Sequence, residues 1–249
     1  MTGPVVGLLG IGAMFLLLFF LRIPAAFTMT LVGFVGIALV TSIDAAFSVL
    51  GTEMWNIFSS YGLTVIPLFV FMAMVLEKSD LVKDLYTAFY KWSGPVRGGL
   101  AVATVLVGAV IGAVSGVVAA GVIGLGLIAL PQMEKYGYDR KIILGSIMSG
   151  GTLGQLIPPS LVMVIYGAVA GVSVGSLFAA GVSAGLLLTG VFCAYILIRS
   201  FINEKLCPAL PIEDRVSIKD KFNSLKALIL PGLLIIMCLG AIFSGAATP

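Results

Sequence analysis

Long apolar segments without charged residues recur along the chain and constrain the fold more than any other feature. A helix needs about 20 mostly apolar residues to cross a hydrocarbon layer about 30 Å thick. Six segments qualify as candidate transmembrane helices: residues 4–21, 25–43, 62–77, 142–170, 176–198 and 226–243. Helices satisfy their own backbone hydrogen bonds inside lipid, so these segments predict an all-α integral membrane protein.

The composition supports a membrane protein and disfavours several other classes. Of the 249 residues, 60% are hydrophobic and 10% are charged, whereas soluble domains carry about 25% charged residues. Histidine is absent, and residues 98–133 and 142–198 contain no acidic residue, so a membrane-embedded enzyme is disfavoured. The net charge of +3 is too small to indicate nucleic-acid binding, and the three cysteines form no CxxC pair.

Two less apolar segments have the pattern of helices that lie along a membrane surface. In residues 44–61, Trp55, Phe58 and Tyr61 recur at helical spacing, and aromatic rings favour the membrane interface. In residues 79–93, one apolar stripe is formed by Leu81, Leu85, Ala88, Phe89 and Trp92.

Residues 98–133 contain no charged residue but do not fit one membrane crossing. As a single helix they would be about 54 Å long, and as two full crossings they would be slightly short. Their midpoint is Ser115-Gly116, within a glycine-rich stretch. We therefore predict a re-entrant hairpin of two half-helices, with a tip surrounded by protein or a water-filled cavity. The alternative for the glycines is a packing interface of small residues.

The distribution of basic residues favours this hairpin. With the N-terminus outside and a hairpin that does not cross, all fourteen Lys and Arg residues lie on the inner face. A single crossing by residues 98–133 would instead move nine of them outside. Basic loops are retained on the cytoplasmic side, so the hairpin topology is the better prediction.

The sequence GGTLGQLIPPS, residues 150–160, predicts a broken helix inside the apolar segment 142–170. Pro158 and Pro159 lack backbone N–H groups, and three glycines weaken the helix before them. A break exposes carbonyls that attract a cation and amide groups that attract an anion. Thr152, Gln155 and Ser160 add polar side chains at this level. The alternative is a proline kink packed against a neighbouring helix.

The segments GGLAVATVLVGAVIGAVSG, LIALPQMEKYGYDRKIILGSIMSGGTLGQLIPPS and IFSGAATP together resemble the large membrane subunit (DctM-type) of TRAP (tripartite ATP-independent periplasmic) transporters. The resemblance covers essentially the whole chain but only the N-terminal half of a usual family member. It implies the first half of an inverted-repeat elevator transporter, present here as a fragment or as part of a split protein.

The resemblance also implies a function, partners and a location. Sodium would be the coupling ion and an organic anion the substrate. The partners would be a small four-helix TRAP membrane subunit and a periplasmic substrate-binding protein. The protein would lie in the bacterial inner membrane with a periplasmic N-terminus and cytoplasmic basic loops.

Family site residues carry over to matching positions of this sequence. Sodium ligands would come from the hairpin tip and the broken helix, at Ser115, Gly116, Gly151, Thr152, Gly154 and Pro158. The substrate path would include Gln155 and Ser160. Carbonyl and hydroxyl oxygens suit sodium, which is a hard cation.

The resemblance and the segment pattern together suggest four regions. Residues 1–61 would form scaffold helices and an interfacial helix, and residues 62–97 a transmembrane helix with a cytoplasmic-side interfacial helix. Residues 98–198 would form the transport repeat, with hairpin 98–133, broken helix 142–170 and helix 176–198. Residues 199–249 would form a cytoplasmic loop and the last transmembrane helix. Two alternatives stay open: another ion-coupled hairpin transporter without a binding protein, and a non-transporting structural subunit.

Overall fold

The computed structural model describes residues 3–60, 65–79, 81–116, 118–204, 206–211 and 217–246, and all regular structure within these ranges is helical. The all-α prediction is therefore confirmed. The chain divides into two compact units, Met1–Tyr61 and Gly62–Pro249.

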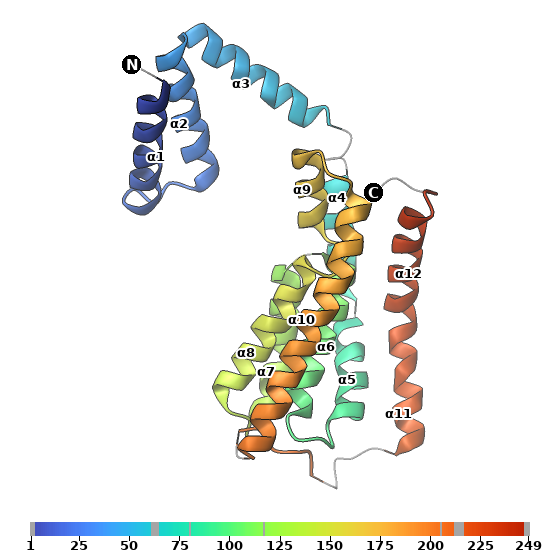
Figure 1. The fold of residues 1–249 in the computed structure, drawn as a ribbon. Helices are drawn as coiled ribbons and strands as arrows, with labels where there is room; N and C mark the ends of the chain where they lie inside the picture. Colours follow the sequence, from blue (N-terminus) through green and yellow to red (C-terminus); the bar gives the residue numbers. More distant parts are fainter. Residues whose placement is uncertain are drawn as a thin grey trace. The chain divides into compact units, whose positions relative to one another are not determined.

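The first unit consists of three helices, α1 (Gly3–Phe19), α2 (Ala25–Val40) and α3 (Ile43–Phe58). Helices α1 and α2 lie side by side, joined by a short turn (Figure 1). The absence of a side chain at Gly10 allows close packing, because a Cβ there would lie 3.3 Å from Cγ1 of Val32. Phe34 on α2 packs edge to face against Phe47 on α3, with ring centroids 4.9 Å apart.

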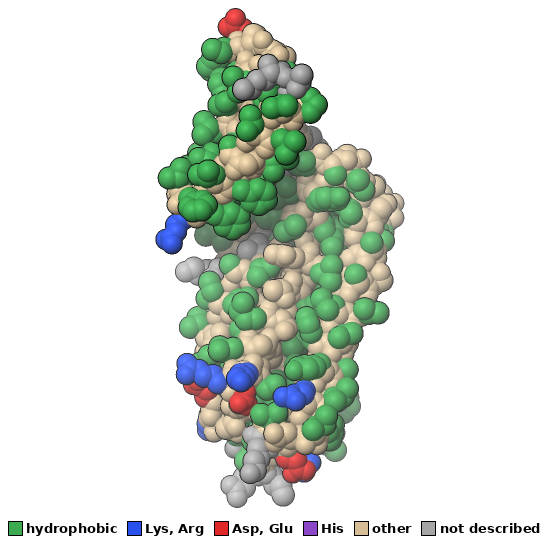
Figure 2. Space-filling view, turned by 60° about the vertical axis from the view of Figure 1, so that its left-hand side comes forward, with side chains coloured by type: hydrophobic (Ala, Val, Ile, Leu, Met, Phe, Trp, Pro, Cys, Tyr) green, Lys and Arg blue, Asp and Glu red, His purple; other side chains and the backbone are tan. Residues whose placement is uncertain are grey.

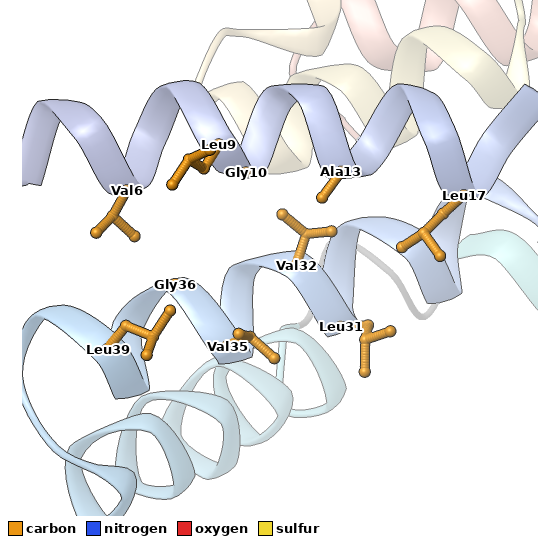
Figure 3. Close-up of a pocket in the computed structure, with 10 residues that line it drawn as sticks. All are labelled: Val6, Leu9, Gly10, Ala13, Leu17, Leu31, Val32, Val35, Gly36 and Leu39. Atoms are coloured by element: carbon orange, nitrogen blue, oxygen red, sulfur yellow. The ribbon is translucent and has the colours of Figure 1, made fainter.

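An apolar groove runs between α1 and α2 (Figure 3). Its volume is about 300 Å³, and its lining residues are Val6, Leu9, Gly10, Ala13, Leu17, Leu31, Val32, Val35, Gly36 and Leu39. Eight of these residues have aliphatic side chains and two are glycines, so the groove provides no side-chain hydrogen-bond partner for a polar solute.

The second unit is built around a central helix, α6. Its helices are α4 (Val65–Lys78), α5 (Leu81–Ser93), α6 (Gly99–Ser115), α7 (Val118–Lys135), α8 (Arg140–Thr152), α9 (Leu161–Ala170), α10 (Val174–Ile202), α11 (Ile218–Ser224) and α12 (Ile229–Phe243). Two short 3-10 turns, η2 (Leu153–Gln155) and η4 (Leu225–Leu228), follow α8 and α11. Fourteen of the seventeen residues of α6 are buried, and α5, α7, α8 and α10 pack around it.

Helices α6 and α7 form an antiparallel hairpin. At its open end, the Leu100 amide donates to the Tyr138 hydroxyl at 3.3 Å, and Thr104 Oγ1 lies 3.9 Å from Met133 Sδ. The chain reverses at Gly116, which has a φ of 62°. One continuous helix over residues 98–133 is thereby excluded, while the depth of this hairpin in a membrane stays a prediction.

The base of the hairpin is held by residues 206–210, which we call the strap. The Leu206 carbonyl accepts a hydrogen bond from the Asp139 amide at 2.9 Å. The Cys207 carbonyl accepts one from the Gly98 amide at 3.2 Å. The strap thus links the turn before α6 to the connection that precedes α8.

Helix α5 places its apolar stripe against protein. Leu85 and Ala88 are buried, and α5 packs against α6 and α7. The sequence predicted a helix along the membrane surface, and the structure adds that this stripe covers the hairpin. Burial of this stripe within the unit therefore explains why α5 is amphipathic.

The outer surface of the second unit is rich in exposed apolar side chains (Figure 2). Leu127 on α7 is 75% exposed, Leu187 on α10 is 70% exposed and Ile236 on α12 is 72% exposed. Soluble monomers rarely expose large apolar surfaces of this kind, whereas a lipid environment favours them.

Two helical stretches among the described residues are long and apolar enough to cross a bilayer, Val174–Ile202 and Ile218–Phe243. The other apolar helices are shorter; α1, with 17 residues, is about 26 Å long. The expectation of six spans therefore stays a prediction. Residues 61–64, at the start of the expected 62–77 span, lie outside the described residues.

Candidate functional site

Helix α6 meets α8 and the following 3-10 turn η2 backbone to backbone below the hairpin tip. A Cβ on Gly108 would lie 2.5 Å from Cα of Gly150, and one on Gly112 would lie 2.4 Å from Cα of Gly154. Any side chain at these α6 positions would overlap the neighbouring main chain. Glycine at a spacing of four residues is the pattern that allows helices to approach this closely.

The hairpin tip continues this contact onto the segment after α8. A Cβ on Gly116 would lie 3.1 Å from the Pro159 carbonyl oxygen and 3.1 Å from the Leu161 amide nitrogen. Gly116 also has a left-handed backbone conformation that a side chain disfavours. Both the turn and the close contact therefore require glycine at the tip.

The α-helix is interrupted between Thr152, where α8 ends, and Leu161, where α9 begins. Within this interruption the Ile157 amide donates to the Leu153 carbonyl at 2.9 Å, and Pro158 has no amide hydrogen. The Gly154 carbonyl therefore receives no helical hydrogen bond from the residues three and four positions later. Such a carbonyl oxygen is available to bind a cation.

Two of the predicted polar residues are buried at this junction. Ser115 is 3% exposed at the end of α6, and Ser160 is fully buried immediately before α9. The Ser160 hydroxyl donates to the Gln155 carbonyl at 2.8 Å. This bond replaces the helical one that Pro159 cannot donate.

The other predicted site residues lie less close to the tip. The Thr152 side chain is exposed and donates back to the Ser149 carbonyl at 2.9 Å, and the Gln155 side chain is also exposed. Gly151 faces α7, because a Cβ there would lie 2.2 Å from Cγ2 of Val122. The structure thus brings Ser115, Gly116, Pro158 and Ser160 to one junction, with Gly154 one turn away beside Gly112.

Sequence reasoning missed the glycines that support the interrupted segment. A Cβ on Gly181 of α10 would lie 2.7 Å from the Leu156 carbonyl oxygen, and one on Gly185 would lie 2.5 Å from Cγ1 of Ile157. The signal that could have identified them is the spacing of four residues between Gly181 and Gly185. Gly108, Gly112 and Gly116 share that spacing.

The junction can offer a ligand two kinds of group: oxygen atoms, and the partial charges at the ends of two helices. Within the part of the chain that the structure describes, no group of three His, Cys, Asp or Glu residues is arranged to hold a metal ion. A cation here would depend on carbonyl and hydroxyl oxygens, which suit hard ions. The end of α8 presents carbonyls, and the start of α9 presents amides that favour an anion.

The open end of the hairpin contains a cluster of tyrosines. The hydroxyl groups of Tyr90 and Tyr136 are 2.9 Å apart. Burial raises the pKa of the Tyr138 phenol well above its usual value, because the ionised form would lose its hydration. The buried Tyr138 phenol is therefore better suited to packing than to ion binding.

Comparison with known proteins gave one family match and several relatives. Residues 12–249 match the family model described as the tripartite ATP-independent periplasmic transporter, DctM component. The C4-dicarboxylate TRAP transporter large permease protein DctM of Pseudomonas aeruginosa is 37% identical over 200 residues. That alignment covers 80% of this chain and 46% of the relative.

Two further relatives have different substrates in their names. The ectoine/5-hydroxyectoine TRAP transporter large permease protein UehC of Ruegeria pomeroyi is 32% identical, covering 75% of this chain and 42% of the relative. The sialic acid TRAP transporter large permease protein SiaM of Vibrio cholerae is 26% identical, covering 100% of this chain and 55% of the relative. The chain spans about half the length of these curated relatives.

Proposed function

Because the chain belongs to the DctM component family of tripartite ATP-independent periplasmic transporters, we propose that it forms the first half of a large permease that couples sodium entry to uptake of an organic anion. Its relatives are permease components, so the function is transport rather than catalysis. The transport domain would move by an elevator mechanism in the bacterial inner membrane.

The observation that carries this proposal is the contact between Gly116 and the interruption of the following helix. A Cβ on Gly116 would lie within 3.1 Å of main-chain atoms of Pro159 and Leu161. The contact brings a helix end, a glycine turn and an interrupted backbone to one place. Discontinuous helices that meet in this way are a general device for binding ions and solutes inside membrane transporters.

The proposed sodium site lies between the hairpin tip and the interrupted helix. Its ligands would be main-chain and hydroxyl oxygens of Ser115, Gly116, Gly151, Thr152, Gly154 and Pro158. The Gly154 carbonyl is the best-supported member, because neither Ile157 nor Pro158 donates a helical hydrogen bond to it. Sodium fits such a set better than a proton does, since proton coupling usually uses an ionisable group.

The proposed substrate is a carboxylate-type organic anion. The names of the relatives include C4-dicarboxylate, ectoine and sialic acid. In this chain, the amide groups at the start of α9 would attract the carboxylate, and Gln155 and Ser160 would line its path. Since Ser160 already donates to the Gln155 carbonyl, we propose that it mainly holds the interrupted segment in shape.

Two partner proteins complete the proposed system. A periplasmic binding protein would deliver the anion, and a small four-helix membrane subunit would support the permease. The N-terminus would lie in the periplasm and the basic loops in the cytoplasm, following the distribution of Lys and Arg.

The decisive experiment measures uptake in proteoliposomes that contain the complete permease, its small subunit and its binding protein. Ser115→Ala and Thr152→Ala are compared with Ser183→Ala, whose exposed hydroxyl donates to the Ala180 carbonyl at 2.9 Å on the face of α10 opposite Gly181 and Gly185. We expect the first two variants to need several-fold more sodium for half-maximal uptake, and the control to match the wild type.

Other outcomes would redirect the proposal. If Ser115→Ala and Thr152→Ala both retain wild-type sodium dependence, the site assignment is wrong. Uptake driven by a proton gradient without the binding protein would indicate another ion-coupled hairpin transporter. A folded protein that supports no uptake with either partner would indicate a structural subunit.

A further inference from the structure

A small groove lies between α8 and α10 on the second unit, away from the hairpin tip. Its volume is about 60 Å³. Helix α8 contributes Lys141, Ile142, Gly145, Ser146 and Ser149 to its lining, and helix α10 contributes Phe192, Tyr195 and Ile196. The groove therefore combines a cation, a phenol and two serines with apolar side chains.

Basic side chains gather at the end of the groove where α8 begins and α10 ends. Lys141 lies in the first turn of α8 and is exposed. Arg199 is exposed in the last turn of α10, one helical turn beyond Tyr195 on the same face. Figure 2 shows Lys and Arg side chains collected near one end of the larger unit, next to a surface of hydrophobic side chains.

The acidic groups nearest this end already have partners. The Asp139 carboxylate caps α8 by accepting the Lys141 amide at 2.9 Å. Glu204, just after α10, forms an ion pair with Arg97. Arg140, Lys141 and Arg199 carry three positive charges at this end, against the single carboxylate charge of Asp139, and this excess favours an anion.

Away from this end, the α10 wall is apolar at Phe192, while α8 contributes the small residues Gly145 and Ser149. A Cβ added to Gly145 would meet no heavy atom within 4 Å, so this glycine leaves open space in the floor. On α10, Leu188 lies one turn above Phe192 on the same face, and both are half-buried. A ligand of matching chemistry has an anionic head and a hydrocarbon chain.

We propose that the groove between α8 and α10 binds an anionic phospholipid. The phosphate would lie between Lys141 and Arg199, near the Tyr195 hydroxyl, and an acyl chain would run past Gly145 along Phe192. Basic pockets between transmembrane helices on the cytoplasmic side commonly bind anionic headgroups. This proposal goes beyond transport, since lipid binding can be measured without substrate or sodium.

Native mass spectrometry of the full-length protein tests the charge part of the proposal. The protein is released from detergent containing equal amounts of phosphatidylglycerol and phosphatidylcholine. We expect retained phosphatidylglycerol to dominate, and its affinity to fall about fivefold in Lys141→Gln and again in Arg199→Gln. Lys219→Gln and Lys226→Gln on the α11–η4 segment remove equal charge elsewhere and should leave the preference intact.

A second pair of variants tests the apolar part of the groove. Gly145→Leu fills its floor, whereas Gly190→Leu places the same side chain on the opposite face of α10, where a Cβ also meets no heavy atom within 4 Å. We expect only Gly145→Leu to lose the bound phosphatidylglycerol.

Three results would overturn the proposal. The first is equal retention of the two lipids by the wild type. The second is an equal loss in the groove and control variants. The third is displacement of phosphatidylglycerol by inorganic phosphate alone, which would identify the groove as a site for soluble anions.

Discussion

A Cβ atom on Gly112 would lie 2.4 Å from Cα of Gly154, so the hairpin and the interrupted helix touch main chain to main chain one turn below Gly116. This contact fixes the position of the hairpin tip relative to the interruption between α8 and α9. Because protein interiors resist small changes in volume, even a methyl group here should move one segment against the other.

Gly112→Ala should destabilise the protein, since its new methyl group has no space beside Gly154. Overpacking of this kind costs about 1–3 kcal/mol. Gly126→Ala on α7 is the matched control, because a Cβ there meets no heavy atom within 4 Å; it should be neutral or gain about 0.5–1 kcal/mol. Thermal unfolding of the purified protein in detergent checks both, and equal unfolding temperatures would contradict the packing argument.

Gly116→Ala should impair transport more than its backbone strain alone explains. Gly116 and Gly171 have φ values of 62° and 65°, so alanine at either position costs roughly 1–2 kcal/mol. Only Gly116 has main-chain neighbours, while a Cβ on Gly171 meets no heavy atom within 4 Å. Uptake assays should show reduced sodium affinity for Gly116→Ala and near-normal affinity for Gly171→Ala. Equal effects would mean that the tip contact has no role beyond folding.

Ser160→Ala should destabilise the interrupted segment by leaving the Gln155 carbonyl without its hydroxyl donor. This hydrogen bond is partly buried, and losing a bond of this kind costs about 0.5–1.5 kcal/mol. The exposed Ser183 hydroxyl bonds only to the carbonyl of Ala180 in its own helix, so this control should change stability by less than about 0.5 kcal/mol. Protease sensitivity in the 153–160 region would report local loosening, and a wild-type cleavage pattern in Ser160→Ala would argue against it.

Single cysteines should reveal the predicted topology. In a background with Cys193, Cys207 and Cys238 replaced by alanine, we expect Asp44→Cys to react with a membrane-impermeant maleimide in intact cells. Lys219→Cys should react only after the membrane is opened, because basic segments are retained inside. Labelling of Lys219→Cys in intact cells would reverse the orientation.

The helical nature of the protein and the interruption near Pro158 and Pro159 follow from the sequence for simple reasons. Apolar segments without charges require internally bonded backbone, and consecutive prolines remove two donors from one turn. The reversal at Gly116 is predictable too, because residues 98–133 are too long for one crossing and too short for two.

The partners of each glycine could not be predicted from the sequence. Gly112 and Gly154 both occur in glycine-rich stretches, but spacing alone does not say which helix each one faces. The exposed position of Thr152 and the burial of Ser160 are also tertiary results, since both residues are polar and lie within the same interrupted helix. For the same reason the stripe on α5 indicated an amphipathic helix but not that it covers α6.

The hydrogen bonds from Gly98 and Asp139 to the strap have a consequence for how the protein is made. Residues 206–210 leave the ribosome long after α6 and α7 have been synthesised, and α10 must be in place before the strap can reach them. Helices α6 and α7 therefore enter the membrane before the strap can accept the hydrogen bonds from the Gly98 and Asp139 amides. Final closure of this region is a late, long-range event of biogenesis, and translation arrested just after α10 should leave the Gly98 and Asp139 amides open to hydrogen exchange.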